Sequence, residues 1–335
     1  MKDKKKFDPN SAAAKDSGIF GLPFSVKDSK LALLQVPWEA TTSYGGGTAE
    51  GPKAILVASR QVDLYDIELG TFYKVGIAMA DESAEIRQWN ATAKKAAKAK
   101  SKKSIKAVNN LSQKVNEFVY NQTKSLLKEN KIVGLVGGDH SSPLGAIKAV
   151  LEVFPKAGIL HFDAHADLRK AYEGFEHSHA SIMYNVLNQT GLEKLVQVGI
   201  RDFSEDEFAL IKKSKPRIKT FFDEKLSEAK FEGKIWADIC LPIVEALPKE
   251  VYISFDIDGL DPVLCPHTGT PVPGGLKFQE ALYLIKLVAT TGRKIIGFDL
   301  NEVTPGPEGD EWDANVGARL LYKLCGWTLQ SQRRK

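Results

Sequence analysis

From Ile132 onward, the chain alternates short runs rich in Val and Ile with longer segments of helical character. We predict β-strands for the runs at 132–136, 157–163, 195–200, 250–257 and 294–299. Strands that alternate with helices in this way indicate an α/β fold, with a parallel sheet and helices on both of its faces. In such a sheet functional residues gather at the carboxyl ends of the strands, so each strand end is a candidate position for a site.

The residues before Ile132 predict further elements of the same kind. We expect strands and helices in turn at Lys30–Pro37, from Gly51 to about Leu64, at Tyr73–Met79, and from about Ile105 to Lys128. The Ala/Lys-rich stretch at about 91–107 mostly lacks an apolar face, which indicates an exposed helical insertion.

Neither an internal repeat nor a second hydrophobic unit is visible in the sequence. This favours one domain over residues 30–327, preceded by an N-terminal arm at 1–29 and followed by a basic C-terminal tail at 328–335. The hydrophobic content of 43% is enough for a sizeable core.

The composition excludes several classes of protein. A net charge of +4 is small for 335 residues, and no aromatic residues interleave with the lysines of the 91–107 stretch, so nucleic acid is not an expected partner. Three widely spaced cysteines form neither a zinc motif nor a disulfide framework. The basic start is not followed by an apolar segment, and no apolar run approaches roughly eighteen residues. We therefore expect a cytoplasmic protein without a membrane span.

The stretch from His161 to Asp167 carries the most specific chemical signal. Side chains alternate along a strand, so His161, Asp163, His165 and Asp167 are expected to share one face. Five of the six histidines of the chain lie between residues 140 and 179. Buried carboxylates and imidazoles in this density need a compensating charge, because unpaired buried ions are costly. A divalent metal supplies it most simply.

Three other predicted strand ends carry polar clusters, at 137–141, 256–262 and 301–303. Together the clusters contain two imidazoles and four carboxylates that are plausible ligands. That is too many donors for one tetrahedral zinc, and thiolates are missing from the set. Mixed nitrogen and oxygen donors with bridging carboxylates are typical of two octahedral or five-coordinate ions about 3.5–4 Å apart.

Five motifs make the chain resemble the ureohydrolase (arginase/agmatinase) family: Gly-Gly-Asp-His-Ser at 137–141, Asp-Ala-His-Ala-Asp at 163–167, Ser-Phe-Asp-Ile-Asp-Gly-Leu-Asp-Pro at 254–262, Thr-Gly-Thr-Pro-Val-Pro-Gly-Gly-Leu at 268–276 and Asn-Glu-Val-Thr-Pro at 301–305. The resemblance implies a three-layer α/β/α sandwich around a mainly parallel eight-stranded sheet. It also implies two Mn²⁺ ions per chain, with Ni²⁺ as an alternative, and a homo-oligomer, either a trimer or a hexamer.

The resemblance further implies six metal ligands: His140, Asp163, His165, Asp167, Asp256 and Asp258. Asp163 and Asp256 would bridge the two ions, with His140 and Asp167 completing one coordination shell and His165 and Asp258 the other. Four carboxylates offset the charge of two dications, and water held between such ions loses a proton near neutral pH.

Two further residues receive catalytic roles from the resemblance, beside the ligand Asp167. Glu302 would pair with the guanidinium of the substrate, and His179 would carry protons. A helix cap or a surface acid is the simpler interpretation of Glu302, and a helix-start residue that of His179. His161 lies deeper than the ligands and is expected to be a core residue or to support one of them.

The substrate's far end is expected to meet the loop from Leu168 to Ser178. This loop lacks the residues with which arginases hold the α-amino acid group. Glu173 and Glu176 would attract a distal ammonium, as in agmatine, and His177 would line the pocket, whereas Arg169 and Lys170 would attract a carboxylate. A solvated loop is the alternative for all of them.

The sequence therefore predicts a hydrolase of linear amidines that converts a guanidino compound to urea and an amine, with agmatine and putrescine as the expected pair. Free guanidine, guanidinobutyrate, guanidinopropionate and formiminoglutamate remain alternative substrates, and a non-catalytic binding homologue is the alternative function.

Overall fold

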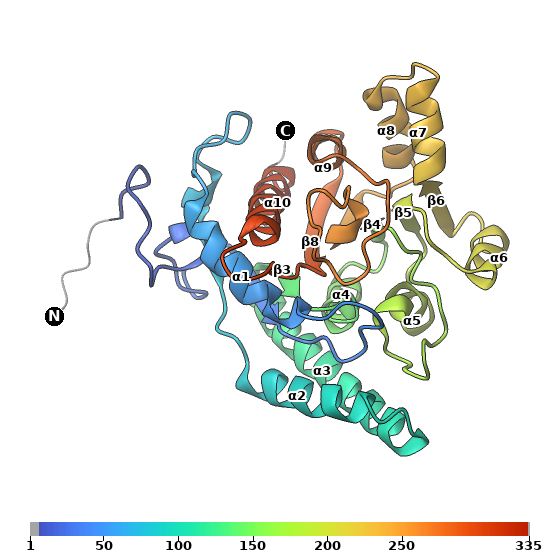
Figure 1. Ribbon diagram of the computed structural model, residues 1–335. Coiled ribbons are helices and arrows are strands. Elements are labelled where there is room, and N and C mark those ends of the chain that lie inside the picture. The colour runs from blue at the N-terminus through green and yellow to red at the C-terminus, as the bar shows by residue number, and fades with distance from the viewer. Residues whose placement is uncertain (1–6, 334–335) are drawn as a thin grey trace.

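The computed structural model describes residues 7–333 and contains one eight-stranded sheet in that range (Figure 1). Every strand pair in it is parallel, and the strand order is β2-β1-β3-β8-β7-β4-β5-β6. The strands are β1 Leu31–Val36, β2 Ile77–Met79, β3 Ile132–Gly137, β4 Gly158–Phe162, β5 Leu195–Ile200, β6 Ile218–Phe222, β7 Glu250–Asp256 and β8 Lys294–Asn301. The predicted parallel sheet is thus confirmed.

Helices cover both faces of the sheet, as the alternating sequence pattern predicted. One hydrophobic cluster joins the sheet to α1 Gly51–Ala58, α8 Trp236–Glu245, α9 Phe278–Thr290 and α10 Trp312–Ser331. Other clusters join it to α2 Ala84–Ala97, α3 Lys102–Lys128, α4 Leu144–Val153 and α5 Ile182–Gln189. The two remaining α-helices are α6 Glu205–Lys213 and α7 Asp223–Phe231. None of the helices in the described range combines the length and the apolar character needed to cross a bilayer.

Residues that alternate along the central strands explain why the sheet is buried on both faces. Val251, Ile253 and Phe255 of β7 belong to the cluster with α8, α9 and α10, whereas Tyr252 between them belongs to the opposite cluster. Such strands are apolar at nearly every position, as parallel sheets covered on both faces require. The Phe162 and Phe255 rings stack with centroids 4.6 Å apart, linking β4 to β7.

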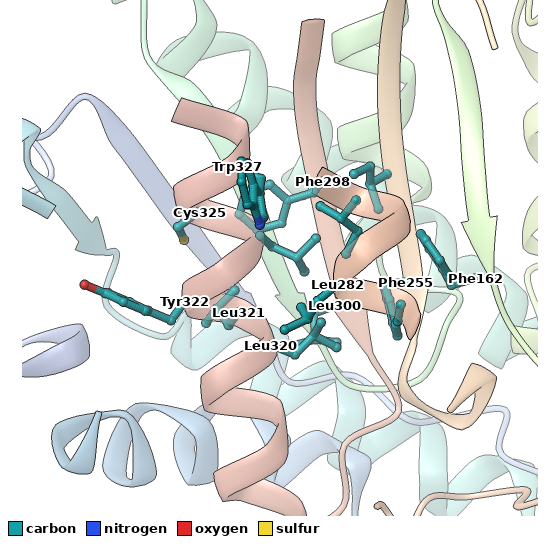
Figure 2. Packing of buried hydrophobic residues seen from close by; sticks show 14 of the residues in the cluster. Phe162, Phe255, Leu282, Phe298, Leu300, Leu320, Leu321, Tyr322, Cys325 and Trp327 are labelled. Carbon is teal, nitrogen blue, oxygen red and sulfur yellow. The ribbon is translucent and has the colours of Figure 1, made fainter. Parts of the chain in front are cut away.

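The long helix α10 covers the middle of the sheet (Figure 2). Leu320, Leu321 and Trp327 on this helix are buried and belong to the same cluster as Phe298 and Leu300 of β8. Residues 328–331, which we predicted to begin a basic tail, form the last turn of this helix, and Thr328 and Leu329 are buried there. The last two residues of the predicted tail lie outside the described range.

The N-terminal elements differ from the prediction in several details. Tyr73 lies in a 3-10 helix, Phe72–Val75, and only Ile77–Met79 pairs as a strand. The predicted helix from Gly51 ends at Ala58 and continues as a 3-10 turn to Gln61. Ile19, Phe20 and Leu22 of the predicted arm are buried in the core, and the arm's first six residues lie outside the described range.

The Ala/Lys-rich stretch is more integrated than an exposed insertion would be. It contains the second half of α2, a turn at 98–101 and the first turns of α3, which a capping box between Ser101 and Ser104 begins. Ala93 is fully buried, and Lys94 forms an ion pair with the buried Glu39. The apolar face of this half of α2 is not evident in the sequence, because alanine provides most of its contact with α3.

Candidate metal centre

Four neighbouring strands, β3, β8, β7 and β4, supply the polar residues at the carboxyl edge of the sheet. His140 follows β3, Glu302 follows β8, Asp256 ends β7, and Asp163 follows β4. These strands are third, eighth, seventh and fourth along the chain, so only the strand order makes their ends adjacent. The site therefore lies at the middle of the sheet, where functional residues of parallel α/β folds gather.

Asp163 lies at the centre of this cluster and faces two groups of donors. Its Oδ2 atom is 3.0 Å from Nδ1 of His140, and its Oδ1 atom is 3.4 Å from Nδ1 of His165. Two sets of possible metal donors share Asp163, one with His140, His161 and Asp167 and the other with His165 and Asp258. Within each set the donor atoms lie within 4.8 Å of one another.

The remaining contacts draw all six predicted ligands together. Nδ1 of His140 is 3.3 Å from Oδ2 of Asp167 and 3.2 Å from Oδ2 of Asp256. Nδ1 of His165 is 3.1 Å from Oδ2 of Asp258. The structure thus brings the six side chains to one place, and their roles as ligands remain a prediction.

Hydrogen bonds behind the cluster fix which nitrogen of His140 faces the carboxylates. The Ser254 hydroxyl donates its single proton to Oδ1 of Asp299, at 2.9 Å. Nε2 of His140 lies 2.9 Å from the same hydroxyl oxygen, so the ring must be the donor in that contact. Against the effect of burial, Asp163, Asp167 and Asp256 raise the pKa of His140 well above its ordinary value. In the neutral ring that a bound metal would select, the Nδ1 lone pair faces these carboxylates, as a metal ligand requires.

The same reasoning gives His161 a different role from His140. The Gln197 amide donates to Nδ1 of His161 at 3.1 Å, so the ring proton lies on Nε2 and is donated to Oδ2 of Asp163 at 2.8 Å. His161 therefore orients Asp163 rather than offering a lone pair, in line with the supporting position expected from the sequence.

The charges of the cluster explain why it fits divalent ions. Burial, and then the neighbouring Asp258 and Asp163, raise the pKa of Asp256 well above its ordinary value. Burial and Asp163 raise the pKa of Asp167 to about 7. Carboxylates packed this closely are held ionised by cations, and hard divalent ions prefer oxygen and imidazole donors such as these. The residues present therefore fit a two-metal centre.

Glu302 is held in a strained conformation beside the cluster. Its φ angle is 63°, a left-handed conformation that is uncommon for a residue with a side chain. The Oε1 atom accepts the backbone N–H of His140 at 2.8 Å, the backbone N–H of Glu302 donates to the Gly138 carbonyl at 2.8 Å, and the Thr268 hydroxyl donates to its carbonyl at 2.8 Å. Strain maintained by this many contacts is typical of functional positions.

His179 lies beside the cluster and begins a 3-10 helix, His179–Ser181. Its backbone N–H donates to the Thr41 hydroxyl at 3.2 Å, and its Nε2 is 3.5 Å from the Ser43 hydroxyl oxygen. Burial, and then the nearby His165, lower the pKa of His179 to about 4. The ring is therefore neutral near neutral pH and can accept a proton.

The predicted substrate-binding residues of the 168–178 loop lie farther from the centre. Glu173 is exposed and forms an ion pair of 3.3 Å with Lys100, Glu176 is exposed, and His177 is half-buried. No hydrogen bond or ion pair within residues 7–333 joins these three side chains to the six clustered ligands. Their role in binding substrate remains a prediction.

Sequence reasoning missed the residues that orient the cluster from behind. Ser254 and Asp299 were detectable in principle, because each lies two positions before a polar strand-end residue, Asp256 and Asn301, and so shares its face. Gln197 was harder to find, since its only signal is one amide inside the apolar strand β5.

Comparison with known proteins shows the family. The model of the arginase family matches residues 29–326, which is most of the chain. The chain belongs to the arginase family. This confirms the resemblance seen in the motifs, makes the protein a hydrolase of the ureohydrolase class, and agrees with the family's dependence on a binuclear metal centre.

Individual relatives match the chain over different lengths. An N(1)-aminopropylagmatine ureohydrolase from Synechocystis sp. is 31% identical, with 93% of each chain covered. An agmatinase from Halalkalibacterium halodurans is 33% identical over 64% of this chain and 71% of its own. The structure of a proclavaminate amidino hydrolase from Streptomyces clavuligerus superposes with a TM-score of 0.75 at 23% identity, covering 96% of this chain and 99% of that one.

Proposed function

We propose that this arginase-family enzyme hydrolyses the guanidino group of agmatine, or of an agmatine extended at its amino end, to urea and a di- or polyamine. The observation that carries the proposal is the pair of donor sets that share Asp163 beside the buried Glu302. The names of the relatives supply the substrate class, since they include an aminopropylagmatine ureohydrolase, 31% identical over 93% of the chain, and an agmatinase, 33% identical over 64% of it.

The proposed centre holds two Mn²⁺ ions. His140, Asp167, Asp163 and Asp256 would hold one ion, and His165, Asp258, Asp163 and Asp256 the other. The contacts of His140 Nδ1 with three of these carboxylates support the first set, and those of His165 Nδ1 with Asp163 and Asp258 support the second. When bound, such a pair of ions lowers the pKa of water and polarises the substrate.

The protein's own groups orient the substrate and move its protons. Burial, and then the neighbouring Asp139, raise the pKa of Glu302 well above its ordinary value, and two bound dications would hold the carboxylate ionised. In that state Glu302 would receive the guanidinium, because a carboxylate matches the planar N–H fork and its Oε1 is fixed by the His140 N–H. His179, with its pKa lowered to about 4, would accept a proton and pass it to the leaving amine. The Ser43 hydroxyl lies beside the His179 ring, and the Thr41 hydroxyl accepts the His179 backbone N–H, so both keep His179 near the cluster.

A substrate panel tests this proposal. The enzyme is loaded with Mn²⁺ or Ni²⁺ and supplied with agmatine, aminopropylagmatine, arginine, guanidinobutyrate, guanidinopropionate, guanidine or formiminoglutamate. We expect urea from agmatine or aminopropylagmatine with the highest kcat/KM. If the enzyme instead releases formamide from formiminoglutamate, or urea mainly from guanidine or a guanidino acid, that compound is the substrate and the proposed substrate is wrong. No turnover of any compound, together with no bound metal, would favour a binding protein.

His179→Ala tests the proton-transfer role. We expect a loss in kcat of roughly 10²-fold or more, because general acid–base catalysis contributes about that much. The metal content should stay at the wild-type level, since the proposed role does not include coordination. Elemental analysis beside steady-state kinetics makes the measurement, and loss of metal in this variant would instead identify His179 as a ligand.

A further inference from the structure

The 168–178 loop is tied to the metal centre at both ends. It begins directly after Asp167 and ends directly before His179, and the Tyr172 ring meets the His179 ring edge to face, with centroids 6.1 Å apart. A change in the shape of this loop therefore moves groups that face the substrate. Asn185 of α5 donates to the Glu176 carbonyl at 2.8 Å, and Glu207 of α6 accepts the N–H of Leu168 at 3.0 Å. Further contacts that fix the shape of the loop come from the hairpin of α2 and α3.

Asn109 of α3 holds the middle of the loop through the backbone. Its Oδ1 accepts the N–H of Glu176 at 3.1 Å, and its Nδ2 donates to the carbonyl of Gly174 at 3.3 Å. One amide thus pairs with a donor and an acceptor of the loop, as a neighbouring strand would. Tyr172 and Phe175 exchange backbone hydrogen bonds of 3.1 and 2.8 Å within the loop, so the held segment is a compact turn.

Packing holds the same turn against the hairpin. Phe175 is buried in the cluster that contains Ile86 and Ala93 of α2 and Val108 of α3. Gly174 has a φ angle of 88°, and a Cβ atom there would lie 3.0 Å from Ile105 of α3, so the backbone approaches the helix closely. The exposed ion pair between Lys100 and Glu173 adds little to this contact.

The hairpin also holds the segment 39–49, which contacts His179. Lys94 of α2 pairs with the buried Glu39, whose Oε2 accepts the N–H groups of Gly47 and Ala49 at 2.6 and 3.1 Å. Asn90 of α2 accepts the N–H of Glu39 at 2.9 Å. The segment 41–46, which lies between Glu39 and Gly47 in the chain, includes the two hydroxyl groups that contact His179.

We propose that the α2–α3 hairpin determines which substrates the enzyme accepts, and that Asn109 is the positioning residue through which it sets the 168–178 loop over the far end of the guanidino compound. The hairpin therefore governs the length of the substrate chain, while the metal ligands and Glu302 act on its guanidino end. This inference rests on the proposed function. It also gives the Ala/Lys-rich stretch a place in the enzyme, since Lys94 pairs with Glu39 and Lys100 pairs with Glu173 of the 168–178 loop.

Asn109→Ala tests the inference, with Asn110→Ala as the matched control, because Asn110 is the next residue of α3 and is exposed. For Asn109→Ala we expect the KM for agmatine to rise about tenfold, the factor that one or two hydrogen bonds are worth. The ratio of kcat/KM between agmatine and aminopropylagmatine should also change. The Ki of guanidinium, a competitive probe without a far end, and the metal content should stay near wild type.

Two further measurements keep the test decisive. Hydrogen exchange should show that residues 172–178 lose protection in Asn109→Ala and not in Asn110→Ala. Asn109→Asp keeps the acceptor for the Glu176 N–H and loses the donor to Gly174, so we expect an intermediate rise in KM; it also serves if the alanine variant fails to fold.

Equal KM values for the two alanine variants would overturn the inference. So would a parallel rise in the guanidinium Ki, which would mean a general loss of the site. If the wild-type enzyme releases urea from none of the compounds, the proposed function fails. Hydrogen exchange alone then decides whether Asn109 holds the 168–178 loop. Protection of 172–178 that survives in Asn109→Ala would then refute it, and protection lost only in that variant would support it.

Discussion

Asp163→Asn is expected to abolish urea release and to lower metal content at both metal positions. Asp163 is fully buried, and its two oxygens face different imidazoles, Oδ2 toward His140 at 3.0 Å and Oδ1 toward His165 at 3.4 Å. The amide keeps the shape and removes the charge that would neutralise both cations. Since metal ions supply several kcal/mol of the catalytic effect, we expect kcat to fall by at least about 10³-fold. Elemental analysis of metal per chain, with kcat measured on the same sample, makes the test.

Asp202→Asn is the matched control for Asp163→Asn. Asp202 is another acid near His165, but its side chain is largely exposed and its carboxylate lies 3.9 Å from Nε2 rather than Nδ1. We expect this variant to keep both ions and most of its turnover. Two tightly held ions with full turnover in Asp163→Asn would show that the bridging assignment is wrong. Asp256→Asn should behave like Asp163→Asn, because it is assigned the same bridging position.

Glu302→Gln is expected to lose most of kcat/KM while it retains the metal. The glutamine oxygen can still accept the N–H of His140, so the local backbone should keep its strained conformation. The charge that would receive the guanidinium beside two dications is lost. Loss of a buried charged partner costs several kcal/mol, so we expect a fall in kcat/KM of roughly 10²- to 10³-fold. Steady-state kinetics and metal analysis measure both quantities.

A neutral analogue separates the charge of Glu302 from its shape. The thiourea analogue of the substrate carries no guanidinium charge, so its binding should weaken much less in Glu302→Gln than that of the guanidino compound. Glu308→Gln, an exposed acid on the same segment after β8, should leave both affinities unchanged. An equal loss of affinity for the two ligands would exclude an anchoring role for Glu302.

The sequence by itself determined the parallel sheet and the polar strand ends that carry the site, and its family motifs named the six candidate ligands. The physical reason is that these features are local. Apolar runs of strand length report burial on both faces, and the alternation of side chains along a strand places Asp163 with His161 and Asp256 with Ser254. The predicted alternation does not extend to His165 and Asp167, because β4 ends at Phe162 and Asp167 has a φ angle of 55°.

Only the tertiary structure decided which strand ends are neighbours and how the surrounding groups act on them. The order β3-β8-β7-β4 joins residues that are far apart in the chain, and no local pattern encodes that order. The ring nitrogen with which His140 faces the carboxylates follows from Ser254 on β7 and Asp299 on β8, two strands that come much later in the chain than β3. The Ala/Lys-rich stretch appeared exposed because alanine and lysine carry no clear hydrophobic signal. The burial of this stretch, and the hydrogen bonds of the nearby Asn109 with the 168–178 loop, join segments that only the folded chain brings together.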